Sequence, residues 1–152
     1  MKNIKTLVFI LTSIFVATSF AKNDTTSASL LEKAWAAYEQ KEWRTAIKIA
    51  DQCIKLFEEE ALKQQASLTE LPSTETAPDY WALNDVGTCF YVKCIALEKL
   101  GDKKKEELIL SLKKLAHELN YAQCWDTKGW YWQPAANAKK KLRQIEFETM
   151  LK

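Results

Sequence analysis

Glycine and proline, the residues that most readily interrupt helices, are scarce and widely spaced in this chain. Only three glycines and three prolines occur among its 152 residues. Between them, apolar residues recur three and four positions apart, the spacing that places side chains on one face of an α-helix. These features predict an all-α fold in which a few interruptions separate amphipathic helices.

The first predicted helix covers residues 30–40. Ser29 followed by Glu32 matches a capping box, in which each side chain satisfies an otherwise unpaired amide at the helix start. Lys41 and Glu42 are predicted to form a tight turn without glycine, and a second helix then covers residues 43–66.

Residues 67–78 are predicted to form an inserted loop, because they contain two prolines and few apolar side chains. Asp79 is expected to cap a third helix at residues 80–100. Gly87 lies within this helix, where its missing side chain would let a neighbouring backbone approach closely.

Gly101 and Asp102 are predicted to end the third helix and to cap a fourth helix over residues 103–118. Residues 121–133 show no clean helical period and are rich in aromatic side chains. Pro134 suits the first position of a last helix, which ends near residue 150.

The first twenty-one residues have the layout of a secretory signal peptide. Lys2 and Lys5 precede an apolar run at residues 7–16, and small residues lead to a predicted cleavage site after Ala21. The run is short for a membrane span, although an uncleaved anchor is the alternative. The prediction is a periplasmic or secreted domain at residues 22–152, with no stable membrane insertion after cleavage.

The charge balance argues against nucleic acid as a partner. The chain has 22 basic and 20 acidic residues, and the two lysines of the signal segment account for the difference. A neutral domain has no basic footprint for a polyanion.

Four cysteines in an exported chain permit two disulfides, whose pairing the sequence does not choose. Buried free thiols are the alternative. The residues are Cys53, Cys89, Cys94 and Cys124. Neither a C-x-x-C pair nor a second histidine accompanies them, so we predict no metal site.

Residues 27–60 resemble a tetratricopeptide repeat, a hairpin of two antiparallel helices. Small residues stand where the helices of such a hairpin cross, and an aromatic residue stands at the turn. These positions are Ala34, Trp43, Ala46 and Cys53.

Residues 87–120 resemble the repeat more loosely. Cys94 takes a small position and Gly101-Asp102 the usual turn, but Glu106 stands where alanine is expected. The resemblance implies two hairpins followed by a C-terminal capping helix at residues 134–150. It also implies a protein-binding or peptide-binding groove, for which the candidate side chains are Trp35, Tyr38, Phe90 and Tyr91.

An aromatic box at residues 121–134 (Tyr-Ala-Gln-Cys-Trp-Asp-Thr-Lys-Gly-Trp-Tyr-Trp-Gln-Pro) is the most individual part of the chain. It is similar to the C-terminal box of a group of exported bacterial tetratricopeptide-like proteins, some labelled beta-glucanase precursor. The box either closes the open end of the helices, contacts a ligand such as a sugar or a peptide, or does both. Its candidate ligand contacts are Trp125, Asp126, Trp130, Tyr131 and Trp132.

Catalysis has little support in the sequence. A glycosidase needs two carboxylates across a cleft, and no motif pairs any two of Asp79, Asp85 and Asp126. His117 is the only histidine, and no cysteine is marked as activated. We therefore predict a module that binds proteins or peptides, with no catalytic residues and no cofactor; the alternative is beta-glucan binding or processing through the aromatic box.

Overall fold

The computed structural model describes residues 25–151, and within this range the fold is all-α apart from one β-hairpin. The elements in chain order are α1 (Ser27–Glu39), α2 (Trp43–Ala66), a 3₁₀ turn (Ala77–Tyr80), α3 (Trp81–Leu100), a 3₁₀ turn (Asp102–Lys104), α4 (Lys105–Glu118), β1 (Cys124–Asp126), β2 (Trp130–Trp132) and α5 (Pro134–Met150). The predicted second, third and last helices are confirmed to within one residue.

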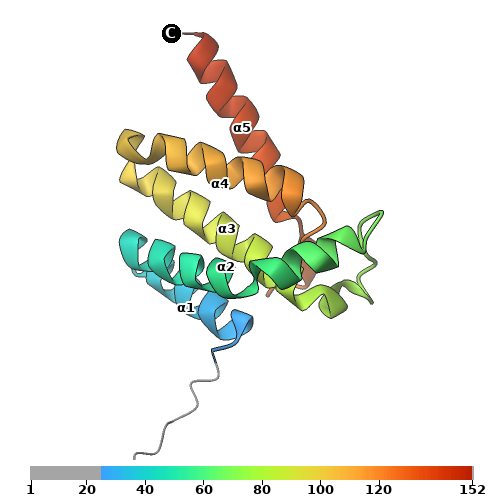
Figure 1. Ribbon diagram of the computed structural model, residues 1–152. Helices are drawn as coiled ribbons and strands as arrows, with labels where there is room; N and C mark the ends of the chain where they lie inside the picture. The colour runs from blue at the N-terminus through green and yellow to red at the C-terminus, as the bar shows by residue number, and fades with distance from the viewer. Residues whose placement is uncertain (1–24, 152) are drawn as a thin grey trace, which may run out of the picture.

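Helix α3 is the centre of the arrangement. It packs against α1 and α2 on one side and against α4 and α5 on the other, as Figure 1 shows. Eleven of its twenty residues are buried, including both large and small apolar side chains. The C-terminal half of α5 projects beyond the other helices (Figure 1), and its residues Phe147 and Met150 are exposed.

Helix α1 begins earlier than predicted. Thr26 is its N-cap, with an extended backbone and a side-chain oxygen that accepts a hydrogen bond from the Ser29 amide at 3.1 Å. The expected capping box at Ser29 and Glu32 is therefore wrong, because Ser29 already lies in the first helical turn. A threonine cap satisfies the same kind of unpaired amide that the box would have satisfied.

The turn between α1 and α2 is as tight as predicted. Lys41 adopts a left-handed conformation, with φ of 64°. Its amide donates to the Tyr38 carbonyl at 2.9 Å, and the Glu42 amide donates to the Ala37 carbonyl at 2.9 Å. This is the Schellman pattern that usually places glycine at the left-handed position.

The start of α3 differs from the prediction. Asp79 does not cap the helix but lies exposed in the preceding 3₁₀ turn. A side chain from α2 serves this end instead, since Gln64 Oε1 accepts from the Leu83 amide at 2.9 Å. The cap comes from a residue nineteen positions away, so local sequence does not reveal it.

The end of α3 matches the prediction more closely. Gly101 takes a positive φ of 79° and its amide donates to the Glu98 carbonyl. Asp102, however, does not cap α4 through its side chain. A 3₁₀ turn of Asp102–Lys104 comes first, and α4 begins at Lys105.

Gly87 permits the close approach that its sequence position suggested. A Cβ added at Gly87 would lie 2.5 Å from the Ala122 Cβ, a separation that real side chains do not show. Ala122 belongs to the segment between α4 and β1 and is fully buried. The missing side chain of Gly87 therefore lets this segment, which leads into the β-hairpin, lie directly on α3.

The long loop between α2 and α3 is attached to the same segment. Tyr121 Oη donates to the Thr69 carbonyl at 2.7 Å, and Gln123 Nε2 donates to the Pro72 carbonyl at 2.7 Å. Asn84 on α3 joins both sides, donating to the Ala77 carbonyl and accepting from the Gln123 amide. The loop and the base of the hairpin thus form one hydrogen-bonded unit.

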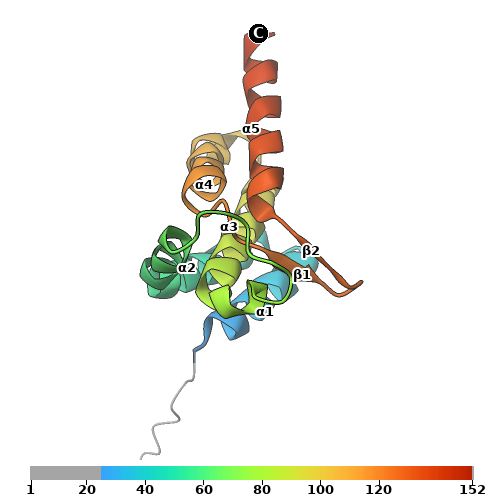
Figure 2. The same cartoon turned by 90° about the vertical axis from the view of Figure 1, so that its right-hand side faces the viewer.

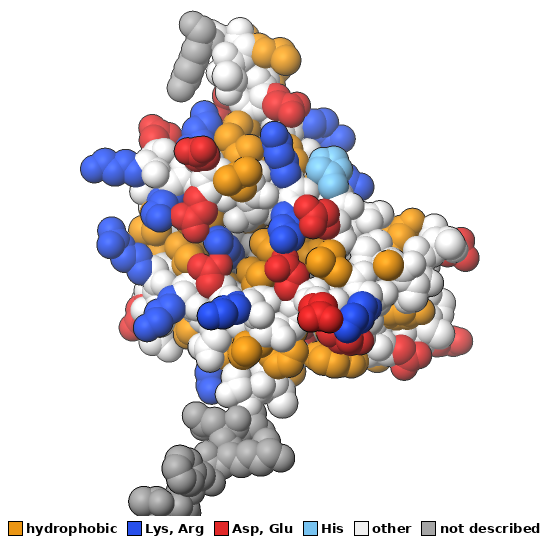
Figure 3. Space-filling view, viewed as in Figure 1, with side chains coloured by type: hydrophobic (Ala, Val, Ile, Leu, Met, Phe, Trp, Pro, Cys, Tyr) orange, Lys and Arg blue, Asp and Glu red, His pale blue; other side chains and the backbone are white. Residues whose placement is uncertain are grey.

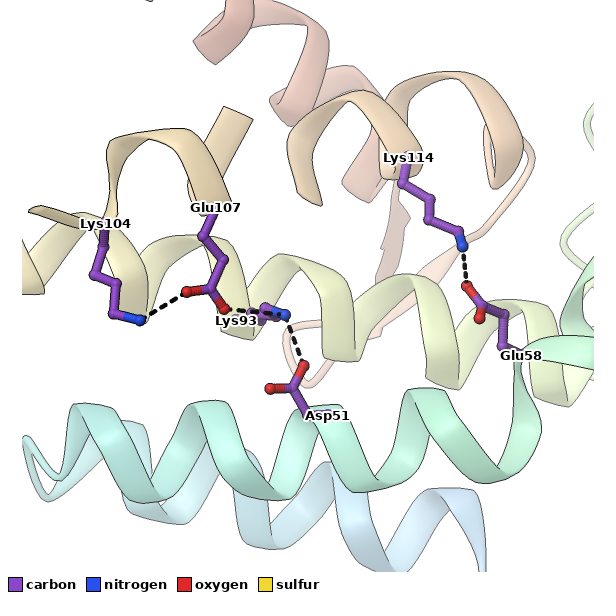
Figure 4. Close-up of polar contacts among 6 residues, drawn as sticks. All are labelled: Asp51, Glu58, Lys93, Lys104, Glu107 and Lys114. Atoms are coloured by element: carbon purple, nitrogen blue, oxygen red, sulfur yellow. Dashed lines mark hydrogen bonds and ion pairs between the residues drawn. The ribbon is translucent and has the colours of Figure 1, made fainter. Parts of the chain in front are cut away.

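Ion pairs join α2, α3 and α4 (Figure 4). Lys93 Nζ lies 2.7 Å from Asp51 Oδ1 and 3.3 Å from Glu107 Oε1, while Lys114 Nζ lies 2.6 Å from Glu58 Oε1. Burial lowers the pKa of Lys93, but hydrogen bonding and charge from Asp51 and Glu107 outweigh it and raise the pKa overall. Charges of both signs are mixed over this face in Figure 3, so it offers no single-sign patch.

The predicted signal peptide at residues 1–21, with its cleavage site after Ala21, lies outside the described residues. Among residues 25–151, no helix combines the length and the apolar character needed to cross a membrane.

Candidate functional site

The aromatic box folds as a β-hairpin around a three-residue loop. Asp126 begins the turn, where its Oδ1 accepts from the Lys128 amide at 2.9 Å and its carbonyl accepts from the Gly129 amide at 2.9 Å. Gly129 has φ of 101°, which suits the left-handed position that closes such a loop. Aromatic residues flank the turn on both sides and favour extended strands.

The register of the hairpin sorts its side chains onto two faces. Cys124 pairs with Trp132 and Asp126 pairs with Trp130, whereas Trp125 pairs with Tyr131 between them. Because successive side chains of a strand point to opposite faces, the central pair faces away from the other four residues. The rings of Trp125 and Tyr131 meet edge to face, with centroids 5.0 Å apart.

The inner face joins a run of aromatic rings that extends to the turn between α1 and α2. Neighbouring rings lie 4.8–6.2 Å apart between centroids, within the range of favourable aromatic contacts. The rings in order are Trp43, Tyr38, Trp35, Tyr91 and Trp132. Figure 2 shows the hairpin reaching out past α1 from the base of α5.

A cavity of about 540 Å³ opens between this ring system and the hairpin. Helix α1 contributes Trp35 and Glu39, helix α3 contributes Tyr91, and the first turn of α5 contributes Asn137. The hairpin supplies the remaining wall, from Cys124, Trp125, Asp126, Thr127, Trp130 and Trp132. We refer to this space as the aromatic cavity.

The structure brings together candidates that the sequence had placed in two separate sites. Trp35 and Tyr91 were assigned to a helical groove, and Trp125, Asp126, Trp130 and Trp132 to the aromatic box; all six line the aromatic cavity.

Three other candidates do not line the cavity. Tyr38 contacts Trp35, which does line the cavity. Tyr131 lies on the outer face of the hairpin together with Trp125, and of these two only Trp125 also borders the cavity. Phe90 is only 5% exposed and belongs to the core, because its position on α3 points it toward the packed helices.

Several cavity residues had no place among the sequence candidates. Tertiary packing brings three such residues to the cavity, and no local sequence pattern predicts this. They are Glu39, Asn137 and Thr127. The hairpin itself did carry a signal. An aspartate three positions before a glycine, between aromatic runs, is typical of a short β-turn between strands.

Two titratable groups of the aromatic cavity are held neutral. Burial is the main cause that raises the pKa of the Tyr91 hydroxyl. Burial also raises the pKa of the Cys124 thiol, helped by the charges of Asp85 and Asp126 and opposed by hydrogen bonds from Thr88 and Trp132.

Asp85, one of the three aspartates considered as possible acids, is half-buried at the junction of α1 and α3. The hydroxyl of Ser27 donates to its Oδ2 at 2.5 Å. Burial raises the pKa of Asp85, while this hydrogen bond opposes the increase. Neither Asp85 nor Asp79 lines the aromatic cavity, so the geometry does not assemble a pair of acids there from the candidates.

The four cysteines, all within the described range, are unbridged in the structure. Cys53 and Cys89 are neighbours at the contact between α2 and α3, and the Cys53 thiol is the main cause that raises the pKa of Cys89. Burial raises the pKa of Cys94 to about 12. The predicted disulfides remain predictions, and the packing favours Cys53 with Cys89 as the pair to examine first.

Within residues 25–151, no cluster of histidine, cysteine and carboxylate side chains is suited to hold a metal ion. Comparison of the chain with protein-family models, with curated proteins and with solved structures gives no match. The geometry of the aromatic cavity is therefore the main indication of function.

Proposed function

We propose that this chain is an exported, non-catalytic helical module that binds a protein or peptide ligand in the aromatic cavity. The observation that carries the proposal is the convergence of Trp35, Tyr91, Trp130 and Trp132 from three separate elements on one cavity of about 540 Å³. A cavity of this size, lined by aromatic rings and a few polar groups, is typical of a ligand site.

The exposed fraction of each hairpin ring distinguishes rings that stabilise the fold from rings that are free to contact a ligand. Trp132 is half-buried against Tyr91, where it fastens the hairpin to α3. Trp130 is 49% exposed although it is only two residues away. A ring that served packing alone would bury more of its surface, so Trp130 is the better candidate for ligand contact.

The resemblance to tetratricopeptide repeats supports the same proposal. The small residues Ala34, Ala46 and Cys53, which the resemblance places where helices cross, are fully buried. The predicted signal peptide supports an extracytoplasmic location, where the ligand would be another envelope or extracellular protein.

Carbohydrate binding is the second candidate function. Trp125 and Trp130 are 56% and 49% exposed, and the nearby Asp126 and Asn137 could hydrogen-bond to sugar hydroxyls. Exposed indole faces next to hydrogen-bonding side chains suit a sugar ring as well as a peptide. The other rings meet at tilted or edge-to-face angles and so offer little flat area, which favours the peptide proposal.

The test compares retention of the purified protein on immobilised blocked hexapeptides of random sequence and on immobilised β-glucan. We expect retention on the peptides, with loss in a Trp130→Ala variant that keeps the wild-type melting temperature. Retention on glucan alone would replace the proposal with carbohydrate binding. Retention on neither would leave the aromatic box as a structural cap and overturn both functions.

A further inference from the structure

The walls of the aromatic cavity combine π faces with carboxylates. Glu39 stands at one side on α1, and Asp126 stands on β1. Lysine and arginine do not occur among the cavity-lining residues, all of which lie in the described part of the chain. The lining therefore has a negative formal charge and includes five aromatic residues, whose ring faces attract cations.

The two carboxylates also have no internal counter-ion. The ion pairs among residues 25–151 involve other acids, and Glu39 and Asp126 are in none of them. Asp126 does take part in one hydrogen bond, in which its Oδ1 accepts from the Lys128 amide in the hairpin turn. This hydrogen bond fixes the orientation of the carboxylate and leaves its charge uncompensated.

One ring of the hairpin already attracts a cation within the molecule. Lys128 Nζ lies 5.8 Å from the centroid of Trp130, within the range of a cation–π interaction. Lys128 is exposed in the turn and is not among the residues that line the cavity. The Trp130 ring is also 49% exposed, so a ligand cation can take the place of Lys128 beside it.

We infer that the aromatic cavity selects the cationic side chain of a lysine or arginine presented by its peptide ligand. The inference depends on the proposed peptide-binding function and specifies the chemistry of its ligand. The aromatic rings accept the alkyl stem and the face of the cationic group, and Glu39 and Asp126 neutralise its charge. An acidic side chain would meet two like charges, and a neutral one would leave both carboxylates without a partner.

The experiment measures binding of blocked hexapeptides that share random flanks and differ at one fixed position. That position is lysine, arginine, norleucine, glutamine or glutamate. Norleucine keeps the apolar stem of lysine and removes its charge. We expect roughly tenfold tighter binding of the lysine and arginine sets than of the norleucine set at low salt, decreasing as added salt screens the carboxylates.

Charge-neutralising variants locate the effect. In Asp126→Asn the side-chain oxygen that accepts from the Lys128 amide is retained, so the hairpin turn is preserved while the charge is lost. Glu39→Gln makes the matching change on α1. Glu75→Gln is the control, since Glu75 is exposed in the loop between α2 and α3 and does not line the cavity.

We expect Asp126→Asn and Glu39→Gln each to reduce the preference for lysine over norleucine several-fold, and Glu75→Gln to leave it unchanged. Equal binding of lysine and norleucine peptides would overturn the cationic selectivity and leave the peptide-binding function standing. A similar reduction in Glu75→Gln would also overturn it, because the effect would then come from overall charge. If no peptide set bound at all, the peptide-binding function itself would be wrong.

Discussion

Small side chains join α2 to α3, whereas large aromatic ones join the β-hairpin to α1 and α3. At the first contact, Ala50, Cys53 and Cys89 are fully buried, and their small side chains let the two helices lie close together. At the second, Trp35, Tyr91 and Trp132 touch through ring edges and enclose a cavity of about 540 Å³. Small residues let the helices pack closely. Rigid rings that meet at angles instead leave a space between the elements that they join.

The largest effect is expected where the hairpin segment lies on α3. Gly87→Ala would place a Cβ 2.5 Å from the Ala122 Cβ. Overpacking of this kind costs about 1–3 kcal/mol, and the upper end applies here because both backbones are held by neighbouring contacts. Chemical denaturation would measure the loss. Adding Ala122→Gly should recover part of it, and a double variant no more stable than Gly87→Ala would contradict the proposed clash.

Trp132→Ala tests whether the aromatic contact also holds the fold. Burial of a tryptophan is worth roughly 3–5 kcal/mol in a core, and Trp132 is only half-buried, so we expect a loss of about 2 kcal/mol. Thermal and urea unfolding would measure it. Trp132→Phe should recover about half of the loss. No change in stability would mean that the hairpin is not fastened through Tyr91.

Lys93→Met tests the ion pairs at the edge of the close-packed helices. The Lys93 side chain is 14% exposed and pairs with Asp51 and Glu107, so removing its charge should cost about 1 kcal/mol. Methionine keeps the apolar stem in place. Lys63→Met is the matched control, since the Lys63–Glu59 pair is exposed on one helix and should contribute almost nothing. Equal losses in the two variants, measured by urea unfolding, would contradict this ranking.

Trp130→Ala sharpens the contrast with Trp132. Because Trp130 is 49% exposed, its removal should change stability by less than about 0.5 kcal/mol. It should nevertheless abolish peptide retention. Melting temperature and peptide retention are measured on the same samples. A large loss of stability would mean that Trp130, like Trp132, holds the fold together.

Asp85→Asn is the smallest expected effect and depends on pH. The folded pKa of Asp85 is raised above its ordinary value of 3.8, so the charged form weakens folding at neutral pH. Asparagine removes that charge and still accepts from Ser27. The variant should therefore be a few tenths of a kcal/mol more stable at pH 7. The gain should disappear as pH falls through the raised pKa toward 3.8, and a variant less stable than wild type at pH 7 would contradict the sign.

The helices could be predicted because each depends on its own residues. The recurrence of apolar positions located α2, α3 and α5, and Gly101 marked the end of α3. Two cap predictions failed for different reasons: at α1 the nearby Thr26 takes the cap position, and at α3 a distant residue does. Gln64 caps α3 in place of Asp79, an arrangement that only the folded chain can provide.

The aromatic cavity was predictable only in pieces. Its rings stood out in the sequence as two unrelated sets, and their meeting depends on Gly87 admitting the Ala122 segment. Glu39 and Asn137 carry no distinguishing pattern, because exposed polar residues on helices are ordinary. The β-hairpin was not predicted, although the aspartate and glycine between its aromatic runs are typical of a short turn between strands.

The hydrogen bonds of Asn84, Tyr121 and Gln123 bear on the order in which the parts of this protein fold. They tie the base of the hairpin to a loop 51 and 52 positions earlier in the chain and to α3, 39 positions earlier. The last wall of the cavity, at Asn137, comes from the beginning of α5. Contacts of such long range form late, after the local helices. A chain cut before α5 would thus have its local helices but an incomplete aromatic cavity.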